Sequence, residues 1–335
     1  MLDYSLYQAC QNKFLIFELK ENLDWQNNRN LRNTFTRLGK KNNVDSVLVL
    51  KGNPRRFYQQ GYHYEMYVFE PKGGSNNGLA GGISTMCGNG VRAVAAFIQK
   101  QFPDTVEARI MTLSGLRTVE IDGSLYTVHM GEFTYHAEDL SKYVNTTLVL
   151  SNKDGNFLDS PIPESILKDL SRFTNSTTWS IGLNGNREGK SIDGEPHVVL
   201  EVPGNQGDIE QLRKLAVETG PIITKNLTCF PKEINANFIF IGKENGESVE
   251  IMNCTHERNL GNDAYHSVTP ACGTGSTVAG GFMLERYPLA RSVLVHCTGG
   301  DLIISKSRSG QELLLKGPAE EVKLILKYLY LFMEH

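Results

Sequence analysis

Short hydrophobic runs of four to eight residues dominate the pattern along this 335-residue chain. They are rich in Val, Ile, Tyr and Phe, and Gly, Asn or Asp commonly marks their ends, which is typical of β-strands. The expected strands are 14–19, 46–50, 62–69, 106–113, 118–121, 126–130, 197–202, 237–241, 248–252, 292–296 and 302–305. The pattern therefore predicts a protein built mainly from β-sheet.

Apolar positions at helical spacing are fewer and predict four helices, over 90–101, 209–218, 275–286 and 318–333. The last has Pro318 near its start and two glutamates in its first turn, residues that helix N-termini favour. Gly-rich or polar stretches at 73–82 and 151–160 are expected to be long loops.

One short motif occurs twice and relates the two halves of the chain. Cys-Gly-Asn-Gly begins at Cys87 and Cys-Gly-Thr-Gly begins at Cys272, an offset of 185 at which Phe97 and Phe282 also coincide. Most of the residues between are small or apolar in both copies. The repeat predicts two similar lobes, each with one Cys-Gly-x-Gly segment that enters a helix.

Charge and composition narrow the classes of partner. Lys plus Arg total 34 and Asp plus Glu total 37, a net charge of −3, so no nucleic-acid-binding surface is expected. No apolar run reaches the length of a membrane span, and charged residues bracket the short apolar stretch at 14–17, unlike the core of an export signal. These features predict a cytoplasmic protein without nucleic-acid or membrane partners.

The six cysteines include no C-x-x-C pair and are too sparse for a disulfide scaffold. Cys10, Cys229, Cys254 and Cys297 lie in or beside strand-like segments and are interpreted as packing residues. Cys254 lies near His256 and Glu257, but this set offers too few ligands for zinc, so no metal site is expected.

The duplicated motif carries a definite chemistry. A helix that begins after Cys-Gly-x-Gly presents free backbone N–H groups, which bind a carboxylate and favour the thiolate of the adjacent cysteine. With one such thiol on each side of a bound carbon, one sulfur can remove a proton while the other delivers a proton to the opposite face. This mechanism inverts the stereocentre and needs no pyridoxal phosphate or other cofactor.

The motifs resemble those of the diaminopimelate epimerase family of cofactor-independent racemases and epimerases, and the resemblance extends over most of the chain. The segments beginning at Cys87 and Ala271 resemble the family's two catalytic motifs. Further landmarks occur in family order: Gln11-Asn12-Lys13-Phe14, Gly194-Glu195-Pro196-His197, Phe230-Pro231 with Asn235, Glu257-Arg258 with Gly261, and Gly299-Gly300-Asp301-Leu302.

The resemblance implies an α+β fold of two pseudo-symmetric lobes, each a mostly antiparallel β-sheet around a central helix, with the active site in the cleft between them. It implies an N-terminal lobe over 1–140, a C-terminal lobe over 141–300 and a C-terminal strand and helix over 301–335 that packs back on the N-terminal lobe. It further implies a homodimer, no cofactor, and the conversion of LL- to meso-diaminopimelate in lysine biosynthesis.

The same resemblance assigns roles residue by residue. Cys87 and Cys272 would be the acid/base pair, and His197 would orient or tune the site. The implied substrate contacts are Asn12, Glu70, Gly88, Asn89, Glu195, Asn235, Glu257, Arg258, Gly273 and Thr274.

Departures from the family pattern concentrate on substrate recognition. Glu195 and Glu70 stand where the family has asparagines, and Val268 falls where it has an acidic residue that binds the substrate amine. The chain also carries insertions over 71–86 and 262–267. The acid/base chemistry is expected to be kept while the substrate side chain stays open.

Three alternatives remain open at the sequence level. A carboxylate at the distal end would repel the second carboxylate of diaminopimelate and attract a basic amino acid such as histidine or lysine, whereas Arg258 favours a carboxylate. An isomerase of a carboxylic acid without an amino group needs no amine-binding residue. A non-catalytic module could use the two helix N-termini only to bind an anion.

Overall fold

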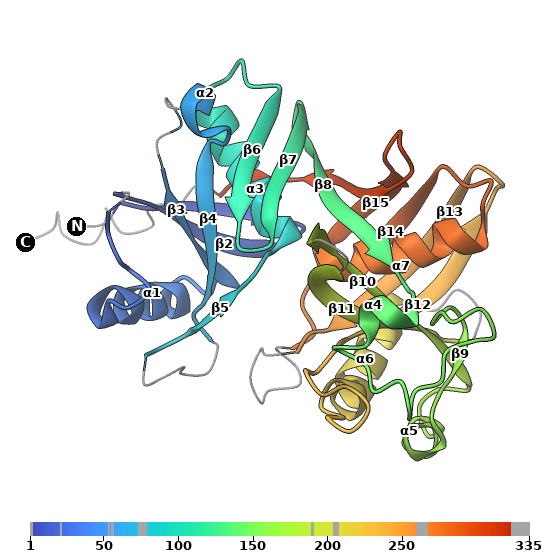
Figure 1. Ribbon diagram of the computed structural model, residues 1–335. Helices are drawn as coiled ribbons and strands as arrows, with labels where there is room; N and C mark the ends of the chain where they lie inside the picture. Colours follow the sequence, from blue (N-terminus) through green and yellow to red (C-terminus); the bar gives the residue numbers. More distant parts are fainter. Residues whose placement is uncertain are drawn as a thin grey trace, which may run out of the picture.

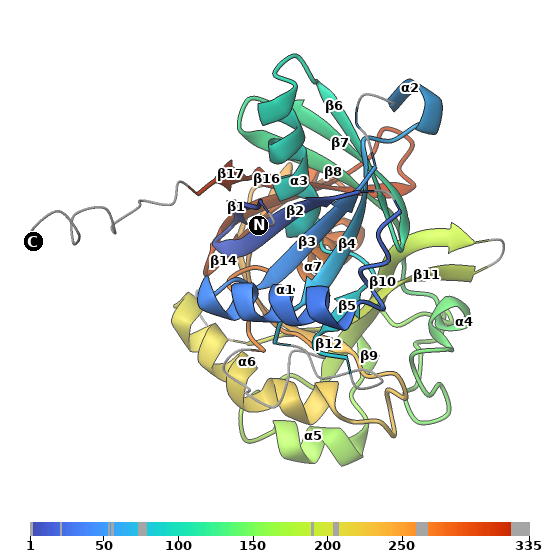
Figure 2. The same cartoon turned by 90° about the vertical axis from the view of Figure 1, so that its left-hand side faces the viewer.

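The chain folds into two lobes that lie side by side, as the computed structural model in Figure 1 shows. The structure describes residues 3–20, 22–52, 54, 57–72, 79–188, 191–203, 208–258 and 267–322. Helices lie mainly on the outside of each lobe, except for one helix per lobe that is enclosed by strands (Figures 1 and 2).

The N-terminal lobe is a sheet in the order β1-β2-β3-β4-β6-β7-β8, in which only the pairs β2–β3 and β4–β6 are parallel. Its elements are β1 (Ser5–Ala9), β2 (Asn12–Leu19), α1 (Arg29–Lys41), β3 (Ser46–Lys51), α2 (Phe57–Gln60), β4 (Tyr64–Glu70), β5 (Gly82–Ser84), α3 (Gly88–Gln101), β6 (Glu107–Thr112), β7 (Gly115–Asp122) and β8 (Leu125–Thr134).

The C-terminal lobe repeats this order as β10-β11-β12-β13-β14-β15-β16, with β11–β12 and β13–β14 parallel. Its elements are α4 (Ala137–Leu140), β9 (Ser160–Pro161), α5 (Glu164–Leu170), β10 (Thr178–Glu188), β11 (Ser191–Glu201), α6 (Ile209–Thr224), β12 (Asn235–Glu244), β13 (Ser248–His256), α7 (Gly273–Arg286), β14 (Ser292–Cys297), β15 (Gly300–Lys306), β16 (Glu312–Pro318) and β17 (Glu320–Glu321). Helices α3 and α7 begin and end 185 residues apart, as do β6 and β14.

The two lobes exchange strands at their junction. The end of β8 pairs with β10 of the C-terminal lobe, and β17 pairs with β1 of the N-terminal lobe. Strands β8 and β16 also pair with each other along most of their length. Each sheet is thus continued by a strand that comes from the other half of the chain, which joins the lobes.

Helices α3 and α7 are each enclosed by the strands of one lobe, because small and apolar side chains cover most of their surface. A Cβ at Gly280 would lie 2.6 Å from the Ile304 side chain, and one at Gly281 would lie 2.9 Å from Leu313. Glycine is therefore required for α7 to fit inside its sheet. The N-termini of both helices point to the junction between the lobes.

All of the strands predicted from the hydrophobic pattern are confirmed, and so are the helices predicted over 90–101, 209–218 and 275–286. The helix predicted over 318–333 is wrong at its start, because residues 320–321 form β17, where the open edge of β1 offers backbone hydrogen-bonding partners. The remainder of that predicted helix, from 323, lies outside the described residues, as do 73–78 of the predicted loop at 73–82.

Candidate active site

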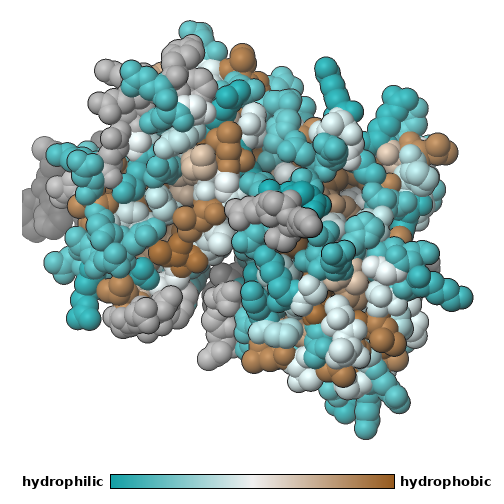
Figure 3. All heavy atoms as spheres, in the orientation of Figure 1, coloured by the Kyte–Doolittle hydropathy of each residue, from teal (hydrophilic) through white to brown (hydrophobic). Residues whose placement is uncertain are grey.

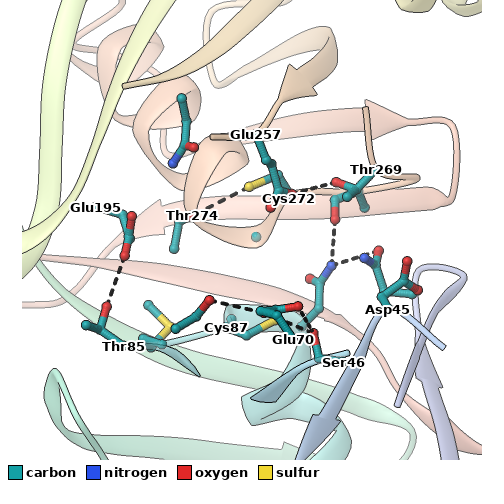
Figure 4. Close-up of a pocket in the computed structure, with 18 of the residues that line it drawn as sticks. Asp45, Ser46, Glu70, Thr85, Cys87, Glu195, Glu257, Thr269, Cys272 and Thr274 are labelled. Atoms are coloured by element: carbon teal, nitrogen blue, oxygen red, sulfur yellow. Dashed lines mark hydrogen bonds between the residues drawn. The ribbon is translucent and has the colours of Figure 1, made fainter. Parts of the chain in front are cut away.

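A cavity of about 480 Å³ lies between the lobes, where the N-termini of α3 and α7 meet. Figure 3 shows a hollow between the two lobes on this face of the molecule. In the close-up of Figure 4, Cys87 with Glu70 and Ser46 faces Cys272 with Glu257 and Thr269 across the pocket.

Every residue assigned by the resemblance to catalysis or substrate contact lines this one cavity, although the residues come from both lobes. They are Asn12, Glu70, Cys87, Gly88, Asn89, Glu195, Asn235, Glu257, Arg258, Cys272, Gly273 and Thr274. The structure brings the set together, while the role of each residue stays a prediction.

The two cysteines occupy matched positions, because each is the N-cap residue of its helix. The Sγ atom of Cys87 accepts a hydrogen bond from the Gly90 N–H at 3.3 Å, and that of Cys272 accepts one from Gly275 at 3.4 Å. The N-terminal end of a helix favours negative charge, so both sulfurs lie where a thiolate and a bound carboxylate would be stabilised.

Burial opposes ionisation of both thiols. It raises the pKa of Cys87 to about 12, with the Gly90 N–H acting in the opposite direction and the Glu70 charge adding to the rise. Burial also raises the pKa of Cys272 well above the usual value, and the neighbouring Glu257 adds to this effect. Burial therefore favours the thiol form of both sulfurs.

A chain of oriented hydrogen bonds ends at Cys272. The Asn237 amide is fixed because its oxygen accepts from Thr255 at 2.7 Å and its nitrogen donates to the Val198 carbonyl at 3.0 Å. The same nitrogen lies 3.0 Å from Nδ1 of His197, which must therefore accept.

Burial, and next the charge of Arg258, lowers the pKa of His197 to about 3, so its ring is neutral near pH 7. The proton of the neutral ring is then on Nε2, which lies 3.1 Å from the hydroxyl of Thr274. That hydroxyl is in turn 3.4 Å from Cys272 Sγ and can donate to it. His197 is buried and does not line the pocket, and it contacts the pocket wall through Thr274.

Two carboxylates accompany the two thiols. Glu70 ends β4 and accepts hydrogen bonds from Ser46 and Ser84 at 3.1 Å, and Glu257 follows β13 and accepts one from Thr269 at 2.6 Å. Glu257 lies beside Cys272 in the pocket wall. Burial raises the pKa of both carboxyl groups to about 7, and for Glu70 the charge of Glu257 adds to the rise.

These raised pKa values predict how stability depends on pH. Between the ordinary value of 4.5 and about 7, the folded protein holds protons on Glu70 and Glu257 that the unfolded chain releases, so both groups make stability fall as pH rises through that range. In thermal melts, the melting temperature of Glu70→Gln is expected to fall less steeply with rising pH than that of the wild type. The variant Glu247→Gln, at an exposed carboxylate, should keep the wild-type slope; equal slopes in all three proteins would contradict the assignment.

Asn12 and Asn89 connect the lobes at the floor of the pocket. The Asn89 side-chain nitrogen donates to the Ala271 carbonyl at 2.8 Å and to the Asn12 side-chain oxygen at 3.2 Å. Asn12 directly follows a tight turn in which Cys10 and Gln11 both have positive φ. The turn aims Asn12 into the pocket, and Asn89 ties the start of α3 to the segment that carries Cys272.

At another wall of the pocket, the guanidinium of Arg258 is already engaged. It donates to Glu195 at 2.8 Å and to the carbonyls of Lys232 and Glu233 at 2.8 and 3.1 Å. The other carboxylate oxygen of Glu195 accepts from Thr85 of the N-terminal lobe at 3.0 Å, a contact visible in Figure 4. Glu195 thus bridges the lobes and pairs with Arg258, the arginine that is expected to contact a ligand.

Sequence reasoning missed several residues of the pocket wall. They are Phe14, Asp45, Ser46, Lys72, Gly82, Ile83, Ser84, Thr85, Met86, Thr269 and Ala271. Thr85, Met86 and Ala271 were detectable because each lies within two residues of a catalytic cysteine, and Phe14 because it belongs to a landmark segment, but nothing local marks the others. Val268, placed by the resemblance at an amine-binding position, is buried against His256 and does not line the pocket.

Over the described ranges, no three His, Cys, Asp or Glu side chains are grouped so as to hold a metal ion. Within the same part of the chain, no helix has the length and apolar character needed to cross a membrane. All six cysteines are free thiols in the structure.

Curated proteins of known name resemble the chain over most of its length. The diaminopimelate epimerase of Methanothermobacter thermautotrophicus is 30% identical over 242 residues, which cover 70% of this chain and 69% of the relative. That of Paraburkholderia xenovorans is 30% identical over 248 residues, covering 72% and 73%. No family model matches.

Solved structures share the fold at low sequence identity. A Bacillus anthracis phenazine biosynthesis protein of the PhzF family superposes with a TM-score of 0.58 at 12% identity and covers 96% of this chain and 97% of its own. A methylitaconate-delta-isomerase gives a TM-score of 0.51 at 12% identity, covering 96% and 94%. These likenesses extend the shared two-lobe fold over nearly the whole chain.

Proposed function

This chain belongs to the diaminopimelate epimerase family and is an isomerase, and from that premise we propose that it inverts the α-carbon of an amino acid with Cys87 and Cys272 as the two proton-transfer groups. The observation that carries the proposal is the placement of both sulfurs at matched helix N-termini on opposite walls of one cavity. Diaminopimelate, the substrate in the relatives' name, is the first candidate, with LL- to meso-diaminopimelate as the reaction.

Each proton transfer balances without a further reactant. The thiolate on one side takes the α-proton, the electron pair of the broken C–H bond stays on the substrate, and its charge spreads into the carboxylate. The thiol on the other side then gives its proton to the opposite face of the same carbon. The first sulfur ends as a thiol and the second as a thiolate, so the roles of the two cysteines are exchanged after one turnover.

The pocket supplies electrostatic stabilisation where negative charge develops. Backbone N–H groups at the starts of α3 and α7 can hydrogen-bond to the α-carboxylate, and both helix ends favour its growing charge. Glu257, next to Cys272, can accept from the α-ammonium group. An ammonium group bound next to this buried carboxylate would balance its charge, because burial disfavours an isolated ion.

Proton exchange in deuterated water tests the proposal directly. Purified protein is incubated with LL-diaminopimelate, lysine, histidine and alanine, and loss of the α-proton signal is followed by NMR together with chiral analysis of the product. Deuterium incorporation with inversion of at least one amino acid is expected. An active preparation of the folded protein that exchanges no α-proton in any of them would refute the reaction.

One observation favours a second candidate, a racemase of basic amino acids. The pocket wall carries four carboxylates, Asp45, Glu70, Glu195 and Glu257, against two cations, Lys72 and Arg258. The Arg258 guanidinium, which would bind a distal carboxylate, is paired with Glu195. A side chain that ends in a cation fits this balance better than one that ends in a second carboxylate.

The variant Glu195→Asn is expected to change the preference between these substrates. It removes one negative charge and releases Arg258, so a distal carboxylate gains a charge-assisted hydrogen bond while a cationic side chain loses an attractive charge. We expect the ratio of kcat/KM for diaminopimelate to that for lysine or histidine to rise about tenfold or more.

The control is Glu132→Gln, which breaks a similar pair with Arg187 outside the pocket. Both variants are compared with the wild type in the same exchange assay. An unchanged substrate ratio in Glu195→Asn would show that the Glu195–Arg258 pair does not govern the distal end.

A further inference from the structure

Glu70 is a carboxylate of the pocket wall that neighbouring strands hold in place. It is the last residue of β4, and it accepts hydrogen bonds from Ser46, the first residue of β3, and from Ser84, the last residue of β5, both at 3.1 Å. Strand β4 pairs with both β3 and β5. The position of the carboxylate is therefore fixed by a sheet, which holds a side chain more precisely than a loop does.

The donors to Glu70 are neutral, and no cation accompanies it. Within the described residues, no Lys, Arg or His side chain forms an ion pair with this carboxylate. Of the two cations in the pocket wall, Arg258 pairs with Glu195, and Lys72 forms no ion pair with Glu70. A carboxylate that is largely removed from water and has no counter-ion is costly, so this group is suited to a cation that arrives with the ligand.

The other three carboxylates of the pocket wall already have a partner or a role. Glu195 accepts from Arg258 at 2.8 Å, and Asp45 accepts from the Lys13 backbone N–H at 2.8 Å. Glu257, on the opposite lobe, is the group that the proposed reaction places next to the α-ammonium. Glu70 is therefore the carboxylate left for a second positive group of the ligand.

Glu70 and Glu257 face each other from the two lobes. Figure 4 shows Glu70 on the Cys87 side of the pocket and Glu257 on the Cys272 side. Burial, and next the charge of Glu257, raises the pKa of Glu70 to about 7, so each carboxylate disfavours the charge of the other. A ligand with one ammonium group would leave one of them without a counter-ion, whereas a ligand with two cations would balance both.

We propose that Glu70 is a specificity-determining residue that binds a positively charged group on the substrate side chain, so that the pocket takes α-amino acids with a second cation. The inference rests on the proposed function and narrows its substrate class. Diaminopimelate, through its distal ammonium, and the basic amino acids belong to this class. Amino acids with neutral or acidic side chains do not.

Glu70 and Glu195 then govern different choices between substrates. Glu70 separates cationic from neutral side chains, with diaminopimelate and lysine in the same group. The Glu195–Arg258 pair separates diaminopimelate from lysine, because it acts on a distal carboxylate. Substitutions at the two glutamates should therefore change different ratios of kcat/KM.

Amino acids that differ by a single amino group test the inference. LL-diaminopimelate is compared with L-2-aminopimelate, and lysine with norleucine, in the α-proton exchange assay. We expect the wild type to prefer the cationic member of each pair that it accepts by about tenfold or more in kcat/KM, because a charge-assisted hydrogen bond is gained. Glu70→Gln keeps an acceptor for the two serine hydroxyls but loses the charge, so this preference should fall about tenfold or more.

Glu132→Gln is the matched control, because it removes a carboxylate that pairs with Arg187 outside the pocket. It should keep the wild-type preference in both pairs. Equal kcat/KM for the cationic and neutral members in the wild type, or a preference unmoved in folded Glu70→Gln, would overturn the inference. The first comparison needs no variant, so it decides even if Glu70→Gln fails to fold.

Binding without turnover separates this inference from the proposed function. In a protein that carries both Cys87→Ala and Cys272→Ala, isothermal titration calorimetry measures the affinity for the same four amino acids, with and without Glu70→Gln. A preference for cations that depends on Glu70, in a protein whose native form exchanges no α-proton, would leave the specificity assignment intact and refute the reaction. Exchange of α-protons without a preference for cationic side chains would refute the specificity assignment alone, and neither binding nor exchange of any cationic amino acid would refute both.

Discussion

Replacing either Cys87 or Cys272 with alanine is expected to reduce inversion of the substrate by about a thousandfold or more, because each variant removes a positioned acid or base from one face of the reacting carbon. The two losses should be similar, since a two-base reaction needs both groups in every turnover. Chiral analysis of the product measures this loss.

The two variants are expected to differ in their partial reactions. With Cys272 removed, Cys87 can still take the proton from the enantiomer whose C–H bond faces it, so deuterium exchange of that enantiomer should persist without inversion. Cys87→Ala should show the same behaviour with the other enantiomer. Cys229→Ala, at a buried cysteine outside the pocket, should keep wild-type activity. Inversion that survives in both single variants would rule out the two-thiol mechanism.

Substituting alanine at the second glycine of each motif is expected to give opposite outcomes at Gly90 and Gly275. A Cβ at Gly275 would lie 2.3 Å from the Asn237 oxygen and 2.7 Å from the Thr255 hydroxyl, two groups held in place by their mutual hydrogen bond. A Cβ at Gly90 would meet the end of the Leu48 side chain at 3.2 Å, a flexible apolar neighbour that can move by a few tenths of an ångström.

We therefore expect Gly275→Ala to destabilise the protein by about 1–3 kcal/mol, as overpacking does, and to remove activity by displacing the hydrogen bonds that orient His197. Gly90→Ala should fold with near wild-type stability, because alanine also has the better helix propensity. Thermal unfolding and the exchange assay on both proteins measure the contrast. Equal destabilisation by the two substitutions would contradict the inference that Gly275 has rigid neighbours and Gly90 a flexible one.

Much of the fold was predictable from the sequence because its signals are local. Short apolar runs identified the strands, and the small-residue motif after each cysteine identified the two central helices. The shared offset of 185 relates the lobes without any knowledge of contacts. The start of the fourth predicted helix was wrong because the partner of residues 320–321 is β1, more than 300 residues earlier in the chain.

The candidate site divides in the same way. Cys87 and Cys272 could be selected from the sequence because their chemistry depends on the residues that immediately follow them. Asp45, Ser46 and Thr269 could not, because they enter the pocket only through the packing of separate strands and loops.

The sequence by itself determined that two helices begin with a cysteine and that the two halves of the chain are related, since helix caps and periodic patterns act over a few residues. Only the tertiary structure decided that Glu195 pairs with Arg258, that Glu70 forms no ion pair in the described residues, and that the two thiols have unlike surroundings. These properties depend on burial and on charges brought together from distant parts of the chain, because desolvation and Coulomb interactions follow distance in space.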